Sequence, residues 1–199
     1  MLKYYAIYKP FGMLSQFHKE GKNKSLTLKD LGFSFALDVY PVGRLDADSE
    51  GLLILTNDKK LNHLLLNPAH RHQRTYLVQV EGVINNEAVK NMERGIEISI
   101  DGTPYFTRPA KAIITSEPEN IPIRTPAVRV RKNIPTSWLT LSLYEGKNRQ
   151  VRRMTAKVGF PTLQLIRISI EDLELAEMKP AEVIELDQKD MYKKLKLVH

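Results

Sequence analysis

The chain has 199 residues, a hydrophobic fraction of 42% and no cysteine. A chain of this length can bury one substantial core or two small lobes that share a sheet. The lack of cysteine excludes thiol catalysis, disulfides and thiolate metal sites, and it favours a reducing, cytoplasmic location. No apolar run approaches the ~20 residues of a membrane-spanning helix, so we expect a cytoplasmic protein without a membrane partner.

Positive charge is concentrated in one segment. The chain has 30 basic and 23 acidic residues, a net charge of +7. Residues 124–153 hold eight basic side chains against the single acid Glu145, so this segment alone carries +7 and the rest sums to zero. Such confinement favours a surface that binds a polyanion, although charged runs are also common on surfaces that bind nothing.

The hydrophobic pattern predicts an α+β fold, because short β-like runs alternate with helices too short and irregularly placed for a doubly wound parallel sheet. Asn57 is expected to cap a helix, and Asp101-Gly102 predicts a hairpin turn. Residues 116–136 hold four prolines and predict an irregular connection. Strands are expected at 3–8, 39–42, 51–55, 75–81, 96–100, 105–108, 110–115, 138–144, 163–170 and 182–186. Helices are expected at 26–31, 58–66, 87–94 and 149–158.

The helix at 149–158 is predicted to be amphipathic. Val151, Met154 and Val158 share one face at helical spacing, and basic residues lie roughly opposite. Asn148 is expected to be the N-cap, so that backbone N–H groups and several cations would point the same way. This arrangement is suited to a phosphate.

In the segment 41–58, an arginine, three carboxylates and two glycines directly precede an apolar run, 52–55, that is typical of a buried strand. A carboxylate on a loop beside such a strand is held by a rigid scaffold and stays open to a ligand. Asp46 could act as a covalent nucleophile at a sugar or base carbon if a nearby cation keeps it ionised. It could equally cap a turn, and the residues leave both roles open.

Other site classes have little support. Asp46, Asp48 and Glu50 have the spacing of calcium ligands, but no glutamate stands at the twelfth position of such a loop. The histidines include no spaced ligand set, so no metal site is expected. A glycosidase carboxylate pair would leave the basic segment unused, and the nucleophile-elbow and phosphate-loop motifs are absent. Tyr76 lies in a predicted strand, where a tyrosine more often packs than reacts.

Four motifs occur in a fixed order along the chain. They are Ile7-Tyr8-Lys9-Pro10-Phe11, Gly43-Arg44-Leu45-Asp46 through Thr56-Asn57, Arg74-Thr75-Tyr76-Leu77-Val78-Gln79-Val80, and Glu145-Gly146-Lys147-Asn148-Arg149-Gln150-Val151-Arg152-Arg153-Met154. This ordered set spans nearly the whole chain and resembles the RsuA-type pseudouridine synthases. The runs at 134–139 and 158–163 resemble the E subgroup of that family, whose members act on large-subunit ribosomal RNA.

The resemblance implies a pseudouridine synthase catalytic core for residues 1–199, with a mixed, largely antiparallel sheet in two subdomains that share it and a central cleft. Many relatives in that family carry an N-terminal RNA-binding module of the S4 type, and we expect none in this chain. The implied activity is the isomerisation of a specific uridine of RNA to pseudouridine, with no cofactor or metal. The E subgroup implies that this uridine lies in 23S ribosomal RNA. A monomer is expected.

The resemblance also assigns roles to residues. Asp46 becomes the catalytic aspartate, Tyr76 the aromatic that packs on the target base, and Arg152 the cation that pairs with Asp46. Helical spacing does not distinguish Arg152 from Arg153; only the resemblance selects Arg152. Attack at C1′, addition at C6 and a glycal route remain open. Lys9 and Pro10 would shape the pocket, and Arg44 would help to hold the target nucleotide extruded. Lys147, Arg149 and Arg153 would contact the RNA backbone. The full set of residues expected to bind the RNA is Lys9, Pro10, Arg44, Lys147, Asn148, Arg149, Gln150 and Arg153.

Three alternatives remain beside this function. The chain could be a non-catalytic RNA-binding factor for ribosome assembly on the same scaffold. It could also be a synthase for another RNA such as tRNA. An enzyme of small sugars or nucleotides would leave the basic segment without a role.

Overall fold

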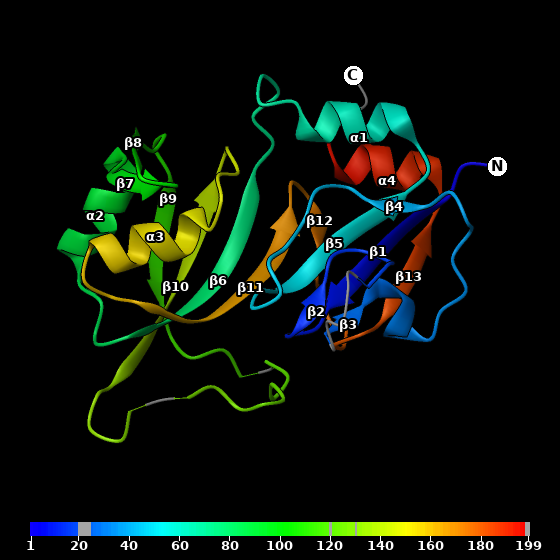
Figure 1. The fold of residues 1–199 in the computed structure, drawn as a ribbon. Coiled ribbons are helices and arrows are strands. Elements are labelled where there is room, and N and C mark those ends of the chain that lie inside the picture. The colour runs from blue at the N-terminus through cyan, green and yellow to red at the C-terminus, as the bar shows by residue number, and fades with distance from the viewer. Residues whose placement is uncertain (20–24, 120, 130, 198–199) are drawn as a thin grey trace. The chain divides into compact units, whose positions relative to one another are not determined.

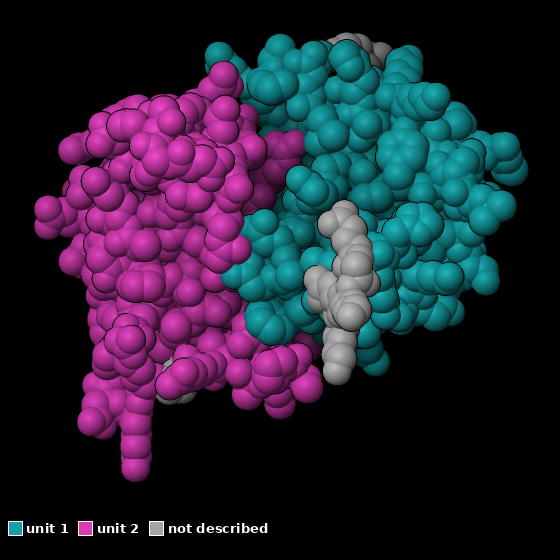
Figure 2. All heavy atoms as spheres, viewed as in Figure 1, with its two compact units in different colours: residues 1–72, 167–199 teal, residues 73–166 magenta. Residues whose placement is uncertain are grey.

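The computed structural model describes residues 1–19, 25–119, 121–129 and 131–197. It has the α+β fold that the sequence predicts (Figure 1). The chain divides into two units, coloured separately in Figure 2. Unit 1 comprises residues 1–72 and 167–199, and unit 2 comprises residues 73–166. Residues 120 and 130 of the predicted proline-rich connection lie outside the described residues.

Unit 1 is built around two wholly buried strands, β1 and β5. Every residue of β1 and β5 is buried, as their apolar composition predicts. β1 pairs antiparallel with both β5 and β13, and the strand order is β13–β1–β5–β11. The strands of this unit are β1 (Tyr4–Lys9), β2 (Met13–Leu14), β3 (Leu26–Thr27), β4 (Tyr40–Pro41), β5 (Glu50–Thr56), β12 (Leu173–Glu174), β13 (Val183–Leu186) and the last part of β11 (Thr162–Ile170).

A glycine lets β5 approach β11 closely. A Cβ atom on Gly51 would lie 2.3 Å from the backbone oxygen of Arg167 and 2.7 Å from its nitrogen. Gly51 also has a φ of 101°, a backbone conformation that residues other than glycine rarely adopt. The Arg167 side chain is buried, and its Nε donates to the Leu52 oxygen at 2.8 Å. The start of β5, which directly follows the loop that holds Asp46 and Asp48, is therefore fixed against β11.

Helices α1 (Lys59–Leu66) and α4 (Gln188–Lys194) lie side by side in unit 1 (Figure 1). The buried Asp58 caps α1, because its Oδ1 accepts from the backbone N–H of Lys60 and Leu61. Its Oδ2 accepts from the hydroxyls of Tyr4 at 2.8 Å and Tyr192 at 2.7 Å. One carboxylate therefore joins α1, α4 and β1.

Two predictions in unit 1 are wrong. Asn57 does not cap α1; its Oδ1 accepts instead from the backbone N–H of Lys3 at 2.7 Å. The helix predicted at 26–31 is β3 followed by one turn of 3₁₀ helix, η1 (Leu28–Leu31). α4 was not predicted at all, since its seven residues are mostly polar.

Unit 2 has the strand order β11–β6–β10–β9, with a separate β7–β8 hairpin that turns at Asp101-Gly102 as predicted. Val151 and Met154 of α3 are buried in the core of this unit, and Val158 packs against it, which confirms the predicted apolar face. The elements are β6 (Arg74–Glu81), α2 (Asn86–Arg94), β7 (Glu97–Ile100), β8 (Thr103–Phe106), β9 (Lys111–Thr115), β10 (Thr136–Leu143) and α3 (Gln150–Lys157).

The start of α3 differs from the prediction. The helix begins at Gln150, and Arg149 occupies the cap position with a φ of 51° and no capping side-chain bond. Asn148 is therefore not the N-cap; its backbone oxygen accepts from Arg153 Nε at 3.0 Å. The turn before α3 is shaped by other contacts, which involve Glu145 and Gln150.

Net charge differs between the units. Unit 2 holds 14 basic and 8 acidic residues, a net charge of +6, whereas unit 1 holds 16 basic and 15 acidic residues, a net charge of +1. Nearly all of the excess positive charge therefore belongs to the unit that contains α3.

Candidate active site

Asp46 lies on a loop of unit 1 that leads into β5, and its side chain is exposed. On one side of it, Ser15 Oγ donates to the Leu45 oxygen at 2.8 Å and accepts from the Leu45 N–H at 3.0 Å. On the other side, the Gly12 N–H donates to the Ala47 oxygen at 2.7 Å. The backbone is thus held on both sides of an accessible carboxylate, which is the arrangement that a reacting group on a loop requires.

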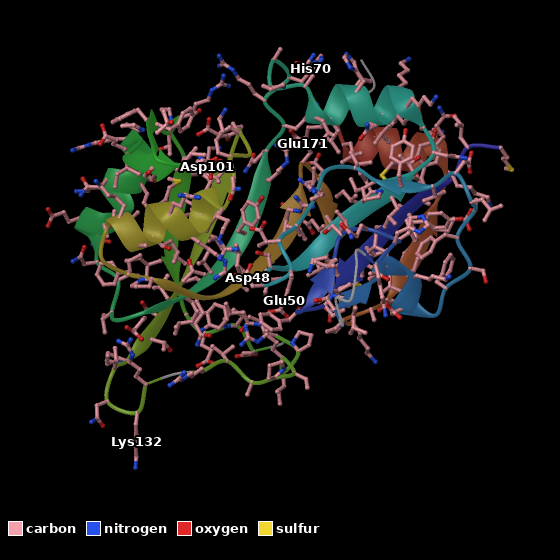
Figure 3. The ribbon with its side chains drawn as sticks, viewed as in Figure 1. Asp48, Glu50, His70, Asp101, Lys132 and Glu171 are labelled. Atoms are coloured by element: carbon pink, nitrogen blue, oxygen red, sulfur yellow. The ribbon has the colours of Figure 1, made fainter. Side chains whose placement is uncertain are left out.

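The two acids after Asp46 become progressively less exposed. Asp48 is half-buried, and Glu50 is only 3% exposed at the start of β5 (Figure 3). The exposed Arg44 lies on the same loop. The structure therefore separates one open carboxylate from a buried one within five residues.

Lys9 is fully buried beside this loop. Its Nζ donates to the oxygens of Met13 at 2.7 Å and Pro10 at 3.1 Å. Burial lowers the pKa of Lys9 to about 8, against the opposing effect of nearby carboxylates, of which Glu50 is the strongest. Lys9 was expected to shape the pocket; its side chain has no exposed surface, so its charge acts inside unit 1. Pro10 is half-buried.

The two residues of unit 2 with predicted catalytic roles lie on different elements. Tyr76 is half-buried on β6 and packs against the core of the unit. Arg152 is half-buried on α3, and one of its terminal nitrogens donates to the Thr162 oxygen at 3.4 Å. Both side chains therefore keep some exposed surface, as their predicted roles require.

The turn before α3 divides the predicted RNA contacts into exposed and buried groups. Lys147, Asn148 and Arg149 are exposed. Gln150 is 3% exposed, and its amide bonds Glu145 and the backbone of Lys147. A direct RNA contact is therefore not available to Gln150, contrary to expectation.

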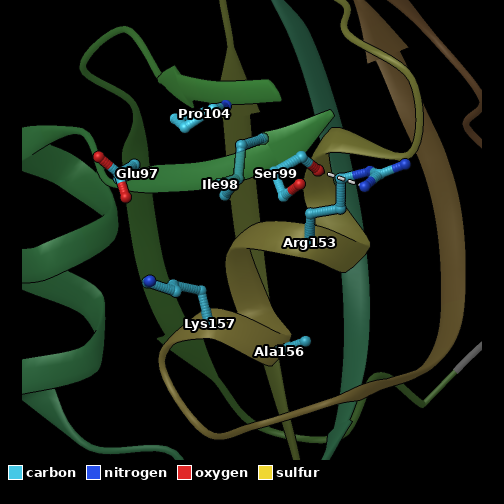
Figure 4. Close-up of a pocket in the computed structure, with 7 residues that line it drawn as sticks. All are labelled: Glu97, Ile98, Ser99, Pro104, Arg153, Ala156 and Lys157. Atoms are coloured by element: carbon cyan, nitrogen blue, oxygen red, sulfur yellow. Dashed lines mark hydrogen bonds between the residues drawn. The ribbon is translucent and has the colours of Figure 1, made fainter. Parts of the chain in front are cut away.

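Arg153 is half-buried and joins α3 to the β7–β8 hairpin. It donates to the backbone oxygens of Ser99 and Asn148, and it lies 3.9 Å from the Asp101 carboxylate. It also lines a cavity of about 430 Å³ in unit 2 (Figure 4). Arg153, which was expected to contact RNA, therefore also makes contacts within unit 2.

Three residues that support these segments were not predicted: Ser15, Glu145 as a structural acid, and Arg167. Ser15 bonds Leu45, which is 30 residues away in sequence, and Arg167 bonds Leu52, which is 115 residues away. Glu145 bonds Gln150, only 5 residues away. No local pattern indicates the two long-range contacts. The signal available in sequence was only that each residue lies in or near a motif.

Within the described residues, no group of three or more acids and histidines could hold a metal ion. None of the helices in that part of the chain is long and apolar enough to cross a membrane.

Comparison with known proteins decides the family. The model of the RNA pseudouridylate synthases matches residues 3–157, which is most of the chain. This chain belongs to that family. It is therefore a pseudouridine synthase, and the resemblance drawn from its four motifs is confirmed.

Individual relatives narrow the subgroup. The synthase is 46% identical over 172 residues to the "Ribosomal large subunit pseudouridine synthase E" of Xanthomonas axonopodis pv. citri, covering 86% of this chain and 87% of that protein. It is 44% identical over 174 residues to the synthase E of Vibrio parahaemolyticus, covering 87% and 69%. These matches confirm the RsuA-type family and its E subgroup.

A solved structure supports the fold. A crystal structure of a pseudouridylate synthase matches this synthase with a TM-score of 0.75 and 25% sequence identity, covering 98% of this chain and 74% of that one. The α+β pseudouridine synthase core is therefore confirmed as the fold class.

Proposed function

We propose that this synthase isomerises one uridine of 23S ribosomal RNA, with Asp46 as the essential aspartate. The observation that carries the role of Asp46 is its exposed carboxylate on a loop whose backbone is bonded on both sides. The ribosomal target is supported by the relatives that are 44–46% identical and named for the large ribosomal subunit. Asp46 would initiate the reaction at C1′, at C6 or by the glycal route.

Two physical needs of the reaction support the part proposed for unit 2. A uridine inside folded RNA must be unstacked before it can react, which costs about a few kcal/mol that contacts elsewhere must offset. The net charge of +6 on unit 2 provides cations for the RNA backbone, of which Lys147 and Arg149 are exposed. Tyr76 would pack on the target base and Arg152 would keep Asp46 ionised, while Arg44 would help to hold the extruded nucleotide.

The replacement Asp46→Asn tests the central role. Cells that lack the gene are rescued with either the wild-type or the variant enzyme, and pseudouridines in their ribosomal RNA are mapped by carbodiimide labelling and reverse transcription. We expect the stop at the target uridine to return with the wild-type enzyme only. Asp48→Asn is the matched control on the same loop and should restore the stop. A stop restored by Asp46→Asn would refute the assignment.

The same map separates the remaining alternatives. If the enzyme-dependent stop appears in tRNA and not in 23S ribosomal RNA, the substrate is a tRNA. Recovery of ribosome assembly by Asp46→Asn without any modified uridine would favour an additional role as a binding factor. Thermal unfolding of both variants checks that each is folded.

A further inference from the structure

We propose that the buried Glu145–Gln150 pair positions Lys147 for a phosphate of the RNA. The inference rests on the proposed RNA-binding function and extends it to residues that do not touch the RNA. Gln150 and Glu145 are positioning residues in this scheme, and Lys147 makes the contact.

The carboxylate of Glu145 is the fixed centre of the arrangement. Its side chain is 6% exposed. Oε1 accepts from Gln150 Nε2 at 2.6 Å and from the Arg108 backbone N–H at 2.9 Å, and Oε2 accepts from the Tyr105 hydroxyl at 2.5 Å. A buried carboxylate with three donors on different elements has little freedom to move.

Gln150 transfers this rigidity to the backbone of Lys147. Its Oε1 accepts from the Lys147 N–H at 3.1 Å, and its own backbone N–H donates to the Lys147 oxygen at 3.1 Å. Both polar groups of the Lys147 backbone are therefore held by one residue. Since Nε2 of the same amide is bonded to Glu145, the amide cannot turn without breaking a buried bond.

The side chain of Lys147 is held by the same network. Its Nζ lies 4.8 Å from the centre of the Tyr105 ring, a cation–π distance. The hydroxyl of that ring is the one bonded to Glu145. The lysine is nevertheless exposed, so its ammonium group is oriented and still accessible. A long side chain ordered in advance loses less rotamer freedom when it binds a phosphate.

Salt dependence distinguishes positioning from simple support of the fold. Each phosphate contact contributes about 0.7 to 0.9 to the slope of log affinity against log salt. Lys147→Gln should lower the slope by about that amount. Gln150→Leu should lower it equally if the amide positions Lys147, because the contact is then lost although the lysine remains.

The experiment measures binding of an unmodified 23S ribosomal RNA transcript at several salt concentrations. Wild type, Lys147→Gln, Gln150→Leu and the double variant are compared, and thermal unfolding is recorded for each. The double variant should bind like Lys147→Gln, because both changes remove one contact. Gln79→Leu is the matched control: Gln79 is a buried glutamine of β6 in the same unit, bonded to Thr136, and its loss should leave the slope unchanged.

An unchanged slope in Gln150→Leu, or effects that add in the double variant, would overturn the proposal. If Gln150→Leu does not fold, Tyr105→Leu serves in its place, since it removes the ring below Lys147; an unchanged slope there would also overturn it. Asp46→Asn should retain the wild-type slope. Failure of the catalytic assignment is thus visible in the uridine map, and failure of the positioning scheme in the slope.

Discussion

Ser15 bonds both backbone polar groups of Leu45, although 30 residues separate the two in sequence. Leu45 directly precedes Asp46, so the conformation of the proposed catalytic loop depends on one hydroxyl from another segment. The Leu45 side chain is itself buried, which fixes the same point by packing.

Ser15→Ala should therefore lower both turnover and stability. Losing the hydroxyl leaves two buried backbone groups without that partner, which costs about 1–3 kcal/mol. A displaced Asp46 should reduce turnover by about tenfold or more, because reacting groups tolerate little misplacement. Single-turnover kinetics and denaturant unfolding measure the two effects.

Ser49→Ala is the matched control for that change. Ser49 is a buried serine of the same loop, and its hydroxyl has no hydrogen-bond partner among the described residues. Its removal should leave turnover and stability near wild type. Equal losses in both variants would contradict the special role of Ser15.

Gly51→Ala should be severely destabilising. The new methyl group would lie 2.3 Å from the backbone of Arg167, in addition to the strain of a positive φ. We expect a loss of more than about 3 kcal/mol in the free energy of unfolding, since neither backbone can easily move. Gly32→Ala separates the two causes: Gly32 also has a positive φ, but a Cβ atom added there would meet no other atom within 4 Å. That control should lose only about 1–2 kcal/mol.

Asp58 should make unit 1 sensitive to acid. Burial acts to raise the pKa of Asp58, but hydrogen bonds from Tyr192, Tyr4 and the α1 backbone outweigh it, so the pKa lies below its usual value of 3.8. The folded state then prefers the ionised carboxylate. The stability that this group contributes is present above about pH 4 and is lost as the pH falls through the lower folded pKa.

Comparison with Asp58→Asn isolates this effect. The variant should be about 1–2 kcal/mol less stable than wild type at pH 7, and the difference should shrink below about pH 4. Chemical unfolding at a series of pH values measures it. Two parallel stability curves would mean that the Asp58 charge contributes nothing.

Lys9 should have the opposite signature in alkali. With its pKa lowered to about 8 from 10.5, the folded protein releases a proton that the unfolded chain retains. Wild-type stability should therefore rise relative to Lys9→Met between about pH 8 and 10.5, by at most about 1.4 kcal/mol per pH unit. Unfolding of both proteins across this range tests the prediction, and a constant difference between them would refute it.

The long strands were predicted well because buried strands are rich in apolar residues, which are visible in the sequence. β5 was expected at 51–55 and extends from Glu50 to Thr56, with every residue buried. Helix caps were predicted less well, because two adjacent residues can serve and a distant contact decides between them. The side-chain oxygen of Asn57 accepts from the backbone N–H of Lys3, so Asp58 caps α1 instead.

A motif is enough to propose Asp46 as the catalytic residue, but the contacts that support its loop come from the fold and were not predicted. Asp46 was identified from its motif. The burial of Lys9 and Gln150 was not predicted, since both were placed among the RNA-binding residues. Lysine and glutamine are mostly exposed in proteins, and their burial here depends on partners that a local pattern does not specify.

Because unit 1 is formed by two separate chain segments, the two units can complete their folding at different times during synthesis on the ribosome. Residues 73–166 emerge as one continuous unit, whereas β1 must wait for its partner β13 at Val183–Leu186. At about 5–20 residues per second, that delay after residue 166 is on the order of seconds. A nascent chain can therefore finish its second unit first, while β1 still lacks one of its two neighbouring strands.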